Sequence, residues 1–110
     1  ASDVYKRQAI IQSITRDYPL TEIKLLSILP VNEGEEYKQT VYIRTNEKIQ
    51  KWNQAYQELA SAYMQVEFVP VFDSLTDQAG QLKKDYTTDG LHLSVAGYQV
   101  LTKSLKDYLL

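Results

Sequence analysis

The stretch IKLLSILP, residues 23–30, carries five large aliphatic side chains in eight positions and shows no alternation of apolar and polar residues. A short apolar run of this kind predicts a strand that is covered on both faces, as in a parallel sheet. The stretch VEFVPVF, residues 66–72, has the same character and predicts a second strand. Pro70 cannot donate to a strand ladder, so the far end of this strand should leave regular pairing.

Three segments with apolar residues at helical spacing surround the two strands. The first covers about residues 5–18, the second residues 49–63 and the third about residues 95–109. The resulting order is α–β–α–β–α. Strands that alternate with helices predict an α/β fold in which parallel strands are joined by right-handed crossovers.

The last two helices have recognisable caps. Thr45 or Asn46 can cap the second helix, and Ser94 can cap the third. We expect a long polar connection over residues 31–45 and a short helical turn near residues 78–84. The apolar stripes that should face the core are Ile49, Trp52, Tyr56, Leu59 and Tyr63 in the second helix, and Val95, Tyr98, Leu101, Leu105 and Tyr108 or Leu109 in the third.

The predicted sheet is too small to be stable by itself. An independent sheet usually needs about three strands or more, and only two are predicted. We therefore expect residues 1–110 to form part of one domain, whose remaining strands come from another chain or from sequence N-terminal to Ala1. The opening ASDVYKRQ has no clear pattern, which makes residues 1–8 a candidate for non-native sequence.

Composition excludes several classes of function. Twelve Lys and Arg stand against 14 Asp and Glu, and this net charge of −2 argues against nucleic acid and against broad attraction to an anionic membrane surface. There is no cysteine and a single histidine, which excludes disulfides, thiolate zinc sites, a cysteine nucleophile and a multi-histidine metal site. No apolar run is long enough to predict a transmembrane segment. The lack of cysteine favours the cytoplasm, while the start at Ala1 leaves secretion open.

The single histidine lies in DYTTDGLHLSVAGYQVL, residues 85–101, three positions after Asp89. The loop after the second strand leads to this stretch from the carboxyl edge of the sheet, where functional groups collect in parallel α/β folds. Gly90 eases a turn in which the Asp89 carboxylate reaches Nδ1–H of His92, leaving Nε2 as a proton acceptor. An ordinary turn followed by the helix cap Ser94 also explains the same residues. Residues 89–92 alone therefore leave open whether this is a catalytic Asp–His pair or a structural turn.

A wider resemblance favours catalysis. TTDGLHLSVAGYQVLTKSL resembles the closing motif of the SGNH hydrolases, also called GDSL esterases and lipases, in which Asp-x-x-His is followed by a small residue, Gly-Tyr and a helix. IKLLSILPVNE resembles their penultimate core strand, NEKIQKWNQAYQELA their next helix, and VEFVPVFDSLTD their last strand and its exit loop. The resemblance is greatest to bacterial relatives of the platelet-activating-factor acetylhydrolase catalytic subunit.

The resemblance implies a flavodoxin-like three-layer sandwich, of which this chain forms only the C-terminal portion. It also implies cleavage of a small-molecule or lipid acyl ester by a Ser-His-Asp triad without metal or cofactor, with His92 as the base and Asp89 orienting it. The family's Gly-Asp-Ser turn and Gly-x-Asn-Asp turn, which carry the nucleophile and oxyanion donors, do not occur in this sequence. We therefore expect the parent protein to be a carboxyl-ester hydrolase and this chain alone to be inactive.

Other interpretations remain open at this point. One alternative is that the chain is a non-catalytic α/β interaction module, which completes its sheet with another chain. A flavodoxin-like nucleotide binder is disfavoured because no Gly-rich phosphate loop is present. Tyr42 or Arg44 would touch an acyl or head group if residues 31–45 faced the substrate, but a solvated connection is favoured. Asp73 and Asp77 could form a carboxylate pair for metal binding or glycosidase chemistry, but capping of the loop is the better explanation.

Overall fold

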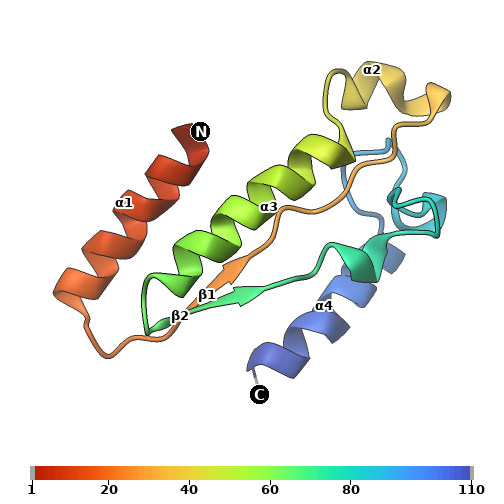
Figure 1. Cartoon of the computed structure of the whole chain (residues 1–110). Coiled ribbons are helices and arrows are strands. Elements are labelled where there is room, and N and C mark those ends of the chain that lie inside the picture. The colour runs from red at the N-terminus through yellow and green to blue at the C-terminus, as the bar shows by residue number, and fades with distance from the viewer. Residues whose placement is uncertain (1, 110) are drawn as a thin grey trace.

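The two predicted strands form a parallel pair in the computed structural model, which describes residues 2–109 (Figure 1). β1 (Ile23–Leu26) pairs with β2 (Val66–Val69), and the register places Ile23 opposite Val66 and Leu26 opposite Val69. Both strands end earlier than predicted. Ser27, directly after β1, explains part of this, because its Oγ accepts a hydrogen bond from the Val71 N–H at 3.1 Å and ties the two exit segments together.

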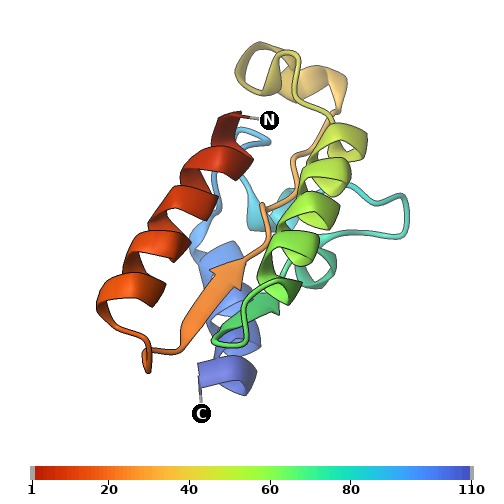
Figure 2. The ribbon, with the colours of Figure 1, turned by 60° about the vertical axis from the view of Figure 1, so that its left-hand side comes forward.

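Helices lie on both sides of this pair (Figures 1 and 2). α1 (Ser2–Asp17) and α3 (Asn46–Ser61) lie side by side on one side, and α4 (Val95–Leu109) lies on the other. The order α–β–α–β–α is therefore confirmed. Short elements fill the connections, namely α2 (Lys38–Val41) and the 3-10 turns η1 (Glu35–Tyr37), η2 (Asp73–Leu75) and η3 (Lys84–Tyr86). No helix within residues 2–109 is long and apolar enough to cross a membrane.

Two clusters contain ten of the 14 buried hydrophobic side chains within residues 2–109. The first lies between α1, α3 and one face of the strands, and it contains Ile11, Leu25, Tyr56, Leu59, Ala60 and Val66. The second lies beyond the carboxyl ends of the strands, and it contains Val31, Val41, Ile49 and Phe72, with Leu91 packed against it. The second cluster links the connection after β1 to the loop of Asp89 and His92, so it positions the candidate site.

The helix boundaries follow the sequence pattern closely. The Thr45 hydroxyl accepts a hydrogen bond from the Lys48 N–H and caps α3, and the Ser94 hydroxyl accepts one from the Gly97 N–H at 3.2 Å at the start of α4. α1 is longer than predicted, since it begins at Ser2 and includes residues 2–8. These caps satisfy backbone donors that the first turn of a helix leaves unpaired.

The predicted helical turn near residues 78–84 is wrong. The chain there makes a polar turn, because Asp77 Oδ1 accepts hydrogen bonds from the N–H groups of Ala79 and Gln81, at 2.9 and 3.0 Å. Gly80 completes the turn at a φ of 77°. An aspartate that bonds to the backbone two residues ahead competes with helix formation.

The predicted apolar stripes are covered unequally. In α3, Ile49, Tyr56 and Leu59 are buried as expected, while Trp52 is 43% exposed. In α4 the prediction of a core-facing stripe is wrong at its start, because Val95 and Tyr98 are 77% and 57% exposed. The contacts of α4 are mainly with η2 and η3, so residues 2–109 leave this part of the stripe uncovered.

Candidate active site

The structure brings Asp89 and His92 into direct contact in the loop between η3 and α4. His92 Nδ1 lies 2.6 Å from Asp89 Oδ2. The other carboxylate oxygen, Oδ1, accepts hydrogen bonds from the backbone N–H groups of Leu91 at 2.9 Å and of His92 at 2.7 Å. Both carboxylate oxygens are thus engaged, which fixes the orientation of the carboxylate relative to the imidazole.

These bonds also set the charge of the pair. The hydrogen bond from the His92 side chain, followed by those from the backbone N–H groups of His92 and Leu91, holds the pKa of the Asp89 carboxyl well below its usual range. An ionised carboxylate only accepts hydrogen bonds, so the neutral imidazole carries its proton on Nδ1. Nε2 then holds the free lone pair. The His92 side chain is 74% exposed, which leaves this nitrogen accessible.

Thr87 holds the loop closed from inside. Its hydroxyl donates a hydrogen bond to the His92 carbonyl oxygen at 2.7 Å and accepts one from the Gly90 N–H at 2.9 Å. Thr87 is only 5% exposed, and it also forms a bridge with Leu93. A buried hydroxyl with both its donor and acceptor used makes the backbone of His92 rigid.

Gly90 is required by both conformation and space. Its φ is 83°, in the left-handed region that residues with a Cβ rarely adopt. A Cβ at this position would also lie 2.5 Å from the Tyr37 Cβ and 3.0 Å from a methyl group of Val41. Tyr37, the last residue of η1, and Val41, the last residue of α2, therefore pack directly against the loop that carries the pair.

The segment after β1 anchors this loop. The Asn32 N–H donates to the Gly90 carbonyl at 2.9 Å, and the Asn32 side-chain amide donates to the Leu82 carbonyl at 2.7 Å. The Leu82 N–H in turn donates to the Val31 carbonyl at 3.1 Å. Residues that are far apart in the sequence are thereby joined at the carboxyl edge of the strands.

Two asparagines of α3 hold the same segment in place. Asn53 accepts a hydrogen bond from the Ile28 N–H at 2.6 Å and donates to the Ile28 carbonyl at 3.1 Å. Asn46 makes the same pair of bonds with Val31, at 2.9 and 2.7 Å. The sequence predicts Asn46 as a possible cap and shows an Asn-x-x-hydrophobic pattern at Asn46 and Asn53, but it does not predict these paired amide bonds. A polar residue at a helix position that faces the core was the signal available for both.

The two loop aspartates differ. The Asp77 carboxylate caps its own turn, which confirms loop capping for this residue. Asp73 accepts a hydrogen bond from the Thr76 hydroxyl at 3.0 Å through its backbone carbonyl, and it lines a cavity, so capping by its side chain stays a prediction. Ser94 Oγ donates to the Asp85 carbonyl at 2.9 Å besides capping α4. Within residues 2–109, no group of three His, Asp or Glu side chains is arranged to hold a metal ion.

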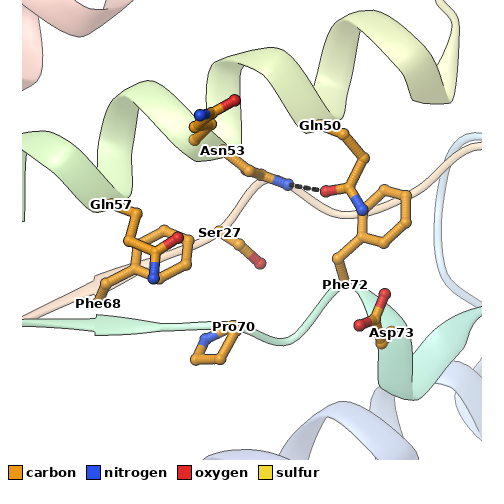
Figure 3. Close-up of a pocket in the computed structure, with 9 residues that line it drawn as sticks. Ser27, Gln50, Asn53, Gln57, Phe68, Pro70, Phe72 and Asp73 are labelled. Carbon is orange, nitrogen blue, oxygen red and sulfur yellow. Dashed lines mark hydrogen bonds between the residues drawn. The ribbon is translucent and has the colours of Figure 1, made fainter.

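A cavity of about 300 Å³ lies elsewhere, between α3 and the segment after β2 (Figure 3). Ser27 and Asn53 line it, and the Asn53 amide donates to the Gln50 side chain at 3.3 Å. Asn53 also holds the Ile28 backbone, and Ser27 accepts from Val71, so these groups are already used in the fold. Asp89 and His92 do not line this cavity, which separates it from the candidate site.

Comparisons with known proteins place this geometry in context. The sequence model of the GDSL-like lipase/acylhydrolase family matches residues 2–100. No curated protein matches the chain. Among solved structures, the chain is similar to a protein from Streptococcus pneumonia that is named for platelet activating factor, with 83% identity and a TM-score of 0.94. That alignment covers 97% of this chain and 50% of the other.

Two more distant structures have the same fold. A protein named as an acylhydrolase from Bacteroides fragilis is 19% identical with a TM-score of 0.68, and the alignment covers 96% of this chain and 50% of that one. A GDSL-like lipase from Bacteroides thetaiotaomicron is 22% identical with a TM-score of 0.66, over 96% and 51% of the two chains. These likenesses confirm the predicted α/β fold. The chain spans about half the length of each of these solved relatives.

Proposed function

This chain belongs to the GDSL-like lipase/acylhydrolase family, and from that membership we propose that it supplies the acid–base pair of a serine carboxyl-ester hydrolase. His92 is the general base and acid, and Asp89 is the residue that orients it. The observation that carries the proposal is the 2.6 Å contact between His92 Nδ1 and an ionised Asp89, which leaves Nε2 exposed as a proton acceptor. The substrate class is an acyl ester.

The chemistry follows from the two nitrogens of His92. Nε2 takes the proton of a serine hydroxyl as its oxygen attacks the acyl carbonyl, and Asp89 stabilises the imidazolium that forms. The imidazolium then gives the proton to the departing alkoxide as the ester C–O bond breaks. A water molecule, deprotonated by Nε2 in the same way, hydrolyses the acyl-serine and restores the enzyme.

The serine and the oxyanion donors come from outside these 110 residues in this proposal. None of the seven serines follows a Gly-Asp pair, and Ser27 and Ser94 are engaged in structural hydrogen bonds. We propose that residues 1–110 form the C-terminal portion of one SGNH hydrolase domain. The complementary segment would extend the sheet and cover the exposed start of the α4 stripe, since two strands are too few for an independent sheet.

The alternative, a non-catalytic module, explains the incomplete sheet equally well. It gives no reason for a loop in which Thr87, Gly90 and Asn32 together fix an Asp–His pair and leave Nε2 free. Catalysis accounts for both features, so we favour it.

A chimera tests the proposal. This chain replaces the matching half of the Streptococcus protein, whose 83% identity makes the interface compatible, and hydrolysis of p-nitrophenyl acetate is measured. We expect turnover in the chimera, a loss of at least about a thousandfold with His92→Ala, and unchanged turnover with the exposed control Gln12→Ala. Full turnover of the His92→Ala chimera would disprove the role of His92. His92-dependent turnover by the 110-residue chain alone would disprove the need for an outside nucleophile.

A further inference from the structure

A shallow groove lies on the side of α2 and α3, apart from the residues of the Asp89–His92 loop. Its volume is about 390 Å³, and its lining consists of Tyr42, Ile43, Arg44, Thr45, Lys48, Ile49 and Trp52. Three of these side chains are large, apolar and exposed, since Tyr42, Ile43 and Trp52 are 75%, 66% and 43% accessible. Neighbouring exposed apolar side chains of this kind mark surfaces that bind a protein partner or a membrane.

The backbone at Tyr42 is strained. Its φ is 56° and its ψ is −116°, and it is the single non-glycine residue with positive φ within residues 2–109. The Arg44 N–H donates to the Val41 carbonyl at 3.0 Å, which closes a four-residue turn with Tyr42 in the position that glycine normally occupies in a type II′ turn. This backbone conformation costs free energy. Because the Tyr42 side chain is mostly exposed, its burial does not offset that cost. The turn places Tyr42 and Ile43 at its tip, where both side chains are exposed.

The charges around the groove have one sign. Arg44 and Lys48 line it, and no acidic residue does. Glu47, the acid between them in the sequence, lies 3.8 Å from Lys51 instead. The Arg44 guanidinium is held toward the turn, where it donates to the Thr40 carbonyl at 3.3 Å. The net charge of the whole chain, −2, argues against broad attraction to an anionic membrane, but two cations four positions apart in the sequence lie beside the apolar patch.

We propose that this groove docks on the surface of a phospholipid bilayer that carries anionic lipids. Trp52 and Tyr42 have the amphipathic rings that favour the membrane–water interface, and Ile43 at the tip of the turn inserts beside them. Arg44 and Lys48 face the lipid phosphates. A second copy of this chain fits less well, because a two-fold contact across the groove brings the same cations together. The docking needs neither Asp89 nor His92, so it stands independently of the proposed activity.

The single tryptophan makes the test specific. Trp52 is the only tryptophan in the chain, so its emission reports this groove alone. The 110-residue chain, with its fold first verified by circular dichroism, is titrated with vesicles of phosphatidylcholine, with or without phosphatidylglycerol. We expect a saturable blue shift with the anionic vesicles that high salt weakens. No shift with the anionic vesicles would overturn the proposal, as would a shift in the absence of lipid caused by self-association and detected by sedimentation. A shift with monomeric decanoate but not with vesicles would overturn the bilayer in favour of a single-chain ligand.

Variants separate the contributions. Arg44→Gln and Lys48→Gln should each weaken partitioning about fivefold, as expected for one cation at an anionic surface. Ile43→Ser should weaken it about tenfold. Leu20→Ser is the matched control, since Leu20 is 96% exposed and does not line the groove, and it should have no effect. Equal binding by the control and the groove variants would refute the site.

Tyr42→Gly gives a second, independent readout. Glycine relieves the strained turn, so this variant should unfold at higher urea and at the same time bind vesicles more weakly. A strained residue kept only for folding would not give this pair of opposite changes. Unchanged vesicle binding by Tyr42→Gly would remove Tyr42 from the docking surface.

Discussion

The loop that carries Asp89 and His92 and the start of α4 are neighbours in the chain, yet they are packed in opposite ways. In the loop, Thr87 is buried, Gly90 is enclosed by Tyr37, and both carboxylate oxygens of Asp89 are hydrogen-bonded. A few residues later, Val95 and Tyr98 expose most of their apolar surface. The pair is therefore assembled by contacts within this chain, while the adjacent apolar face is left exposed by residues 2–109.

This difference suggests a division of roles. A catalytic pair needs its geometry fixed to a fraction of an ångström, and short hydrogen bonds to nearby backbone provide that. An apolar docking face needs area, which a partner can cover later. Three variants test whether the two regions are as independent as their packing indicates.

Gly90→Ala should be the most disruptive single change in the loop. The new methyl group meets Tyr37 and Val41 at a positive φ, so we expect a loss of about 3 kcal/mol or more in the free energy of unfolding, measured by urea denaturation. Gly80→Ala is the matched control, because Gly80 has a similar φ of 77° but no atom near its added Cβ. It should cost about 1 kcal/mol. Equal losses would show that conformation alone, and not the contact with Tyr37, governs Gly90.

The Asp89 carboxylate should make stability depend on pH. Its pKa is lower in the folded chain than in the unfolded chain, so its contribution is present above the unfolded pKa, near 4, and is lost as the pH falls toward the folded pKa. Asp89→Asn should therefore show a flatter loss of stability below about pH 4 in urea titrations. The exposed carboxylate variant Asp107→Asn serves as the comparison and should follow the parent chain. Identical acid profiles for Asp89→Asn and the parent would contradict the hydrogen-bonded, ionised carboxylate.

Tyr98→Ser should have the smallest effect on this chain. Its side chain is 57% exposed, so the free energy of unfolding of the 110 residues should change by less than about 0.5 kcal/mol. The same substitution in the chimera with the complementary half should lower stability clearly if that half covers α4. Equal, small effects in both backgrounds would mean that the α4 face stays exposed in the complete domain.

Much of the fold is readable from local sequence pattern. The continuous apolar runs predicted both strands and their parallel arrangement, and the caps Thr45 and Ser94 predicted where α3 and α4 begin. Where prediction failed, a competing local bond or a missing cover was responsible. Asp77 forms its own hydrogen bonds in place of a predicted helical turn, and nothing within residues 2–109 buries the start of the α4 stripe.

The candidate site shows the same difference between what local sequence predicts and what tertiary packing adds. Asp89 and His92 are three residues apart, so a single turn can bring them together, and the local sequence was enough to predict this contact. The tertiary structure decided what surrounds them. Asn32 meets Gly90 and Asn46 meets Val31 only once the segments are folded on one another. Periodicity and short turns depend on neighbours in the chain, whereas burial and amide clamps depend on long-range packing that no single stretch of sequence contains.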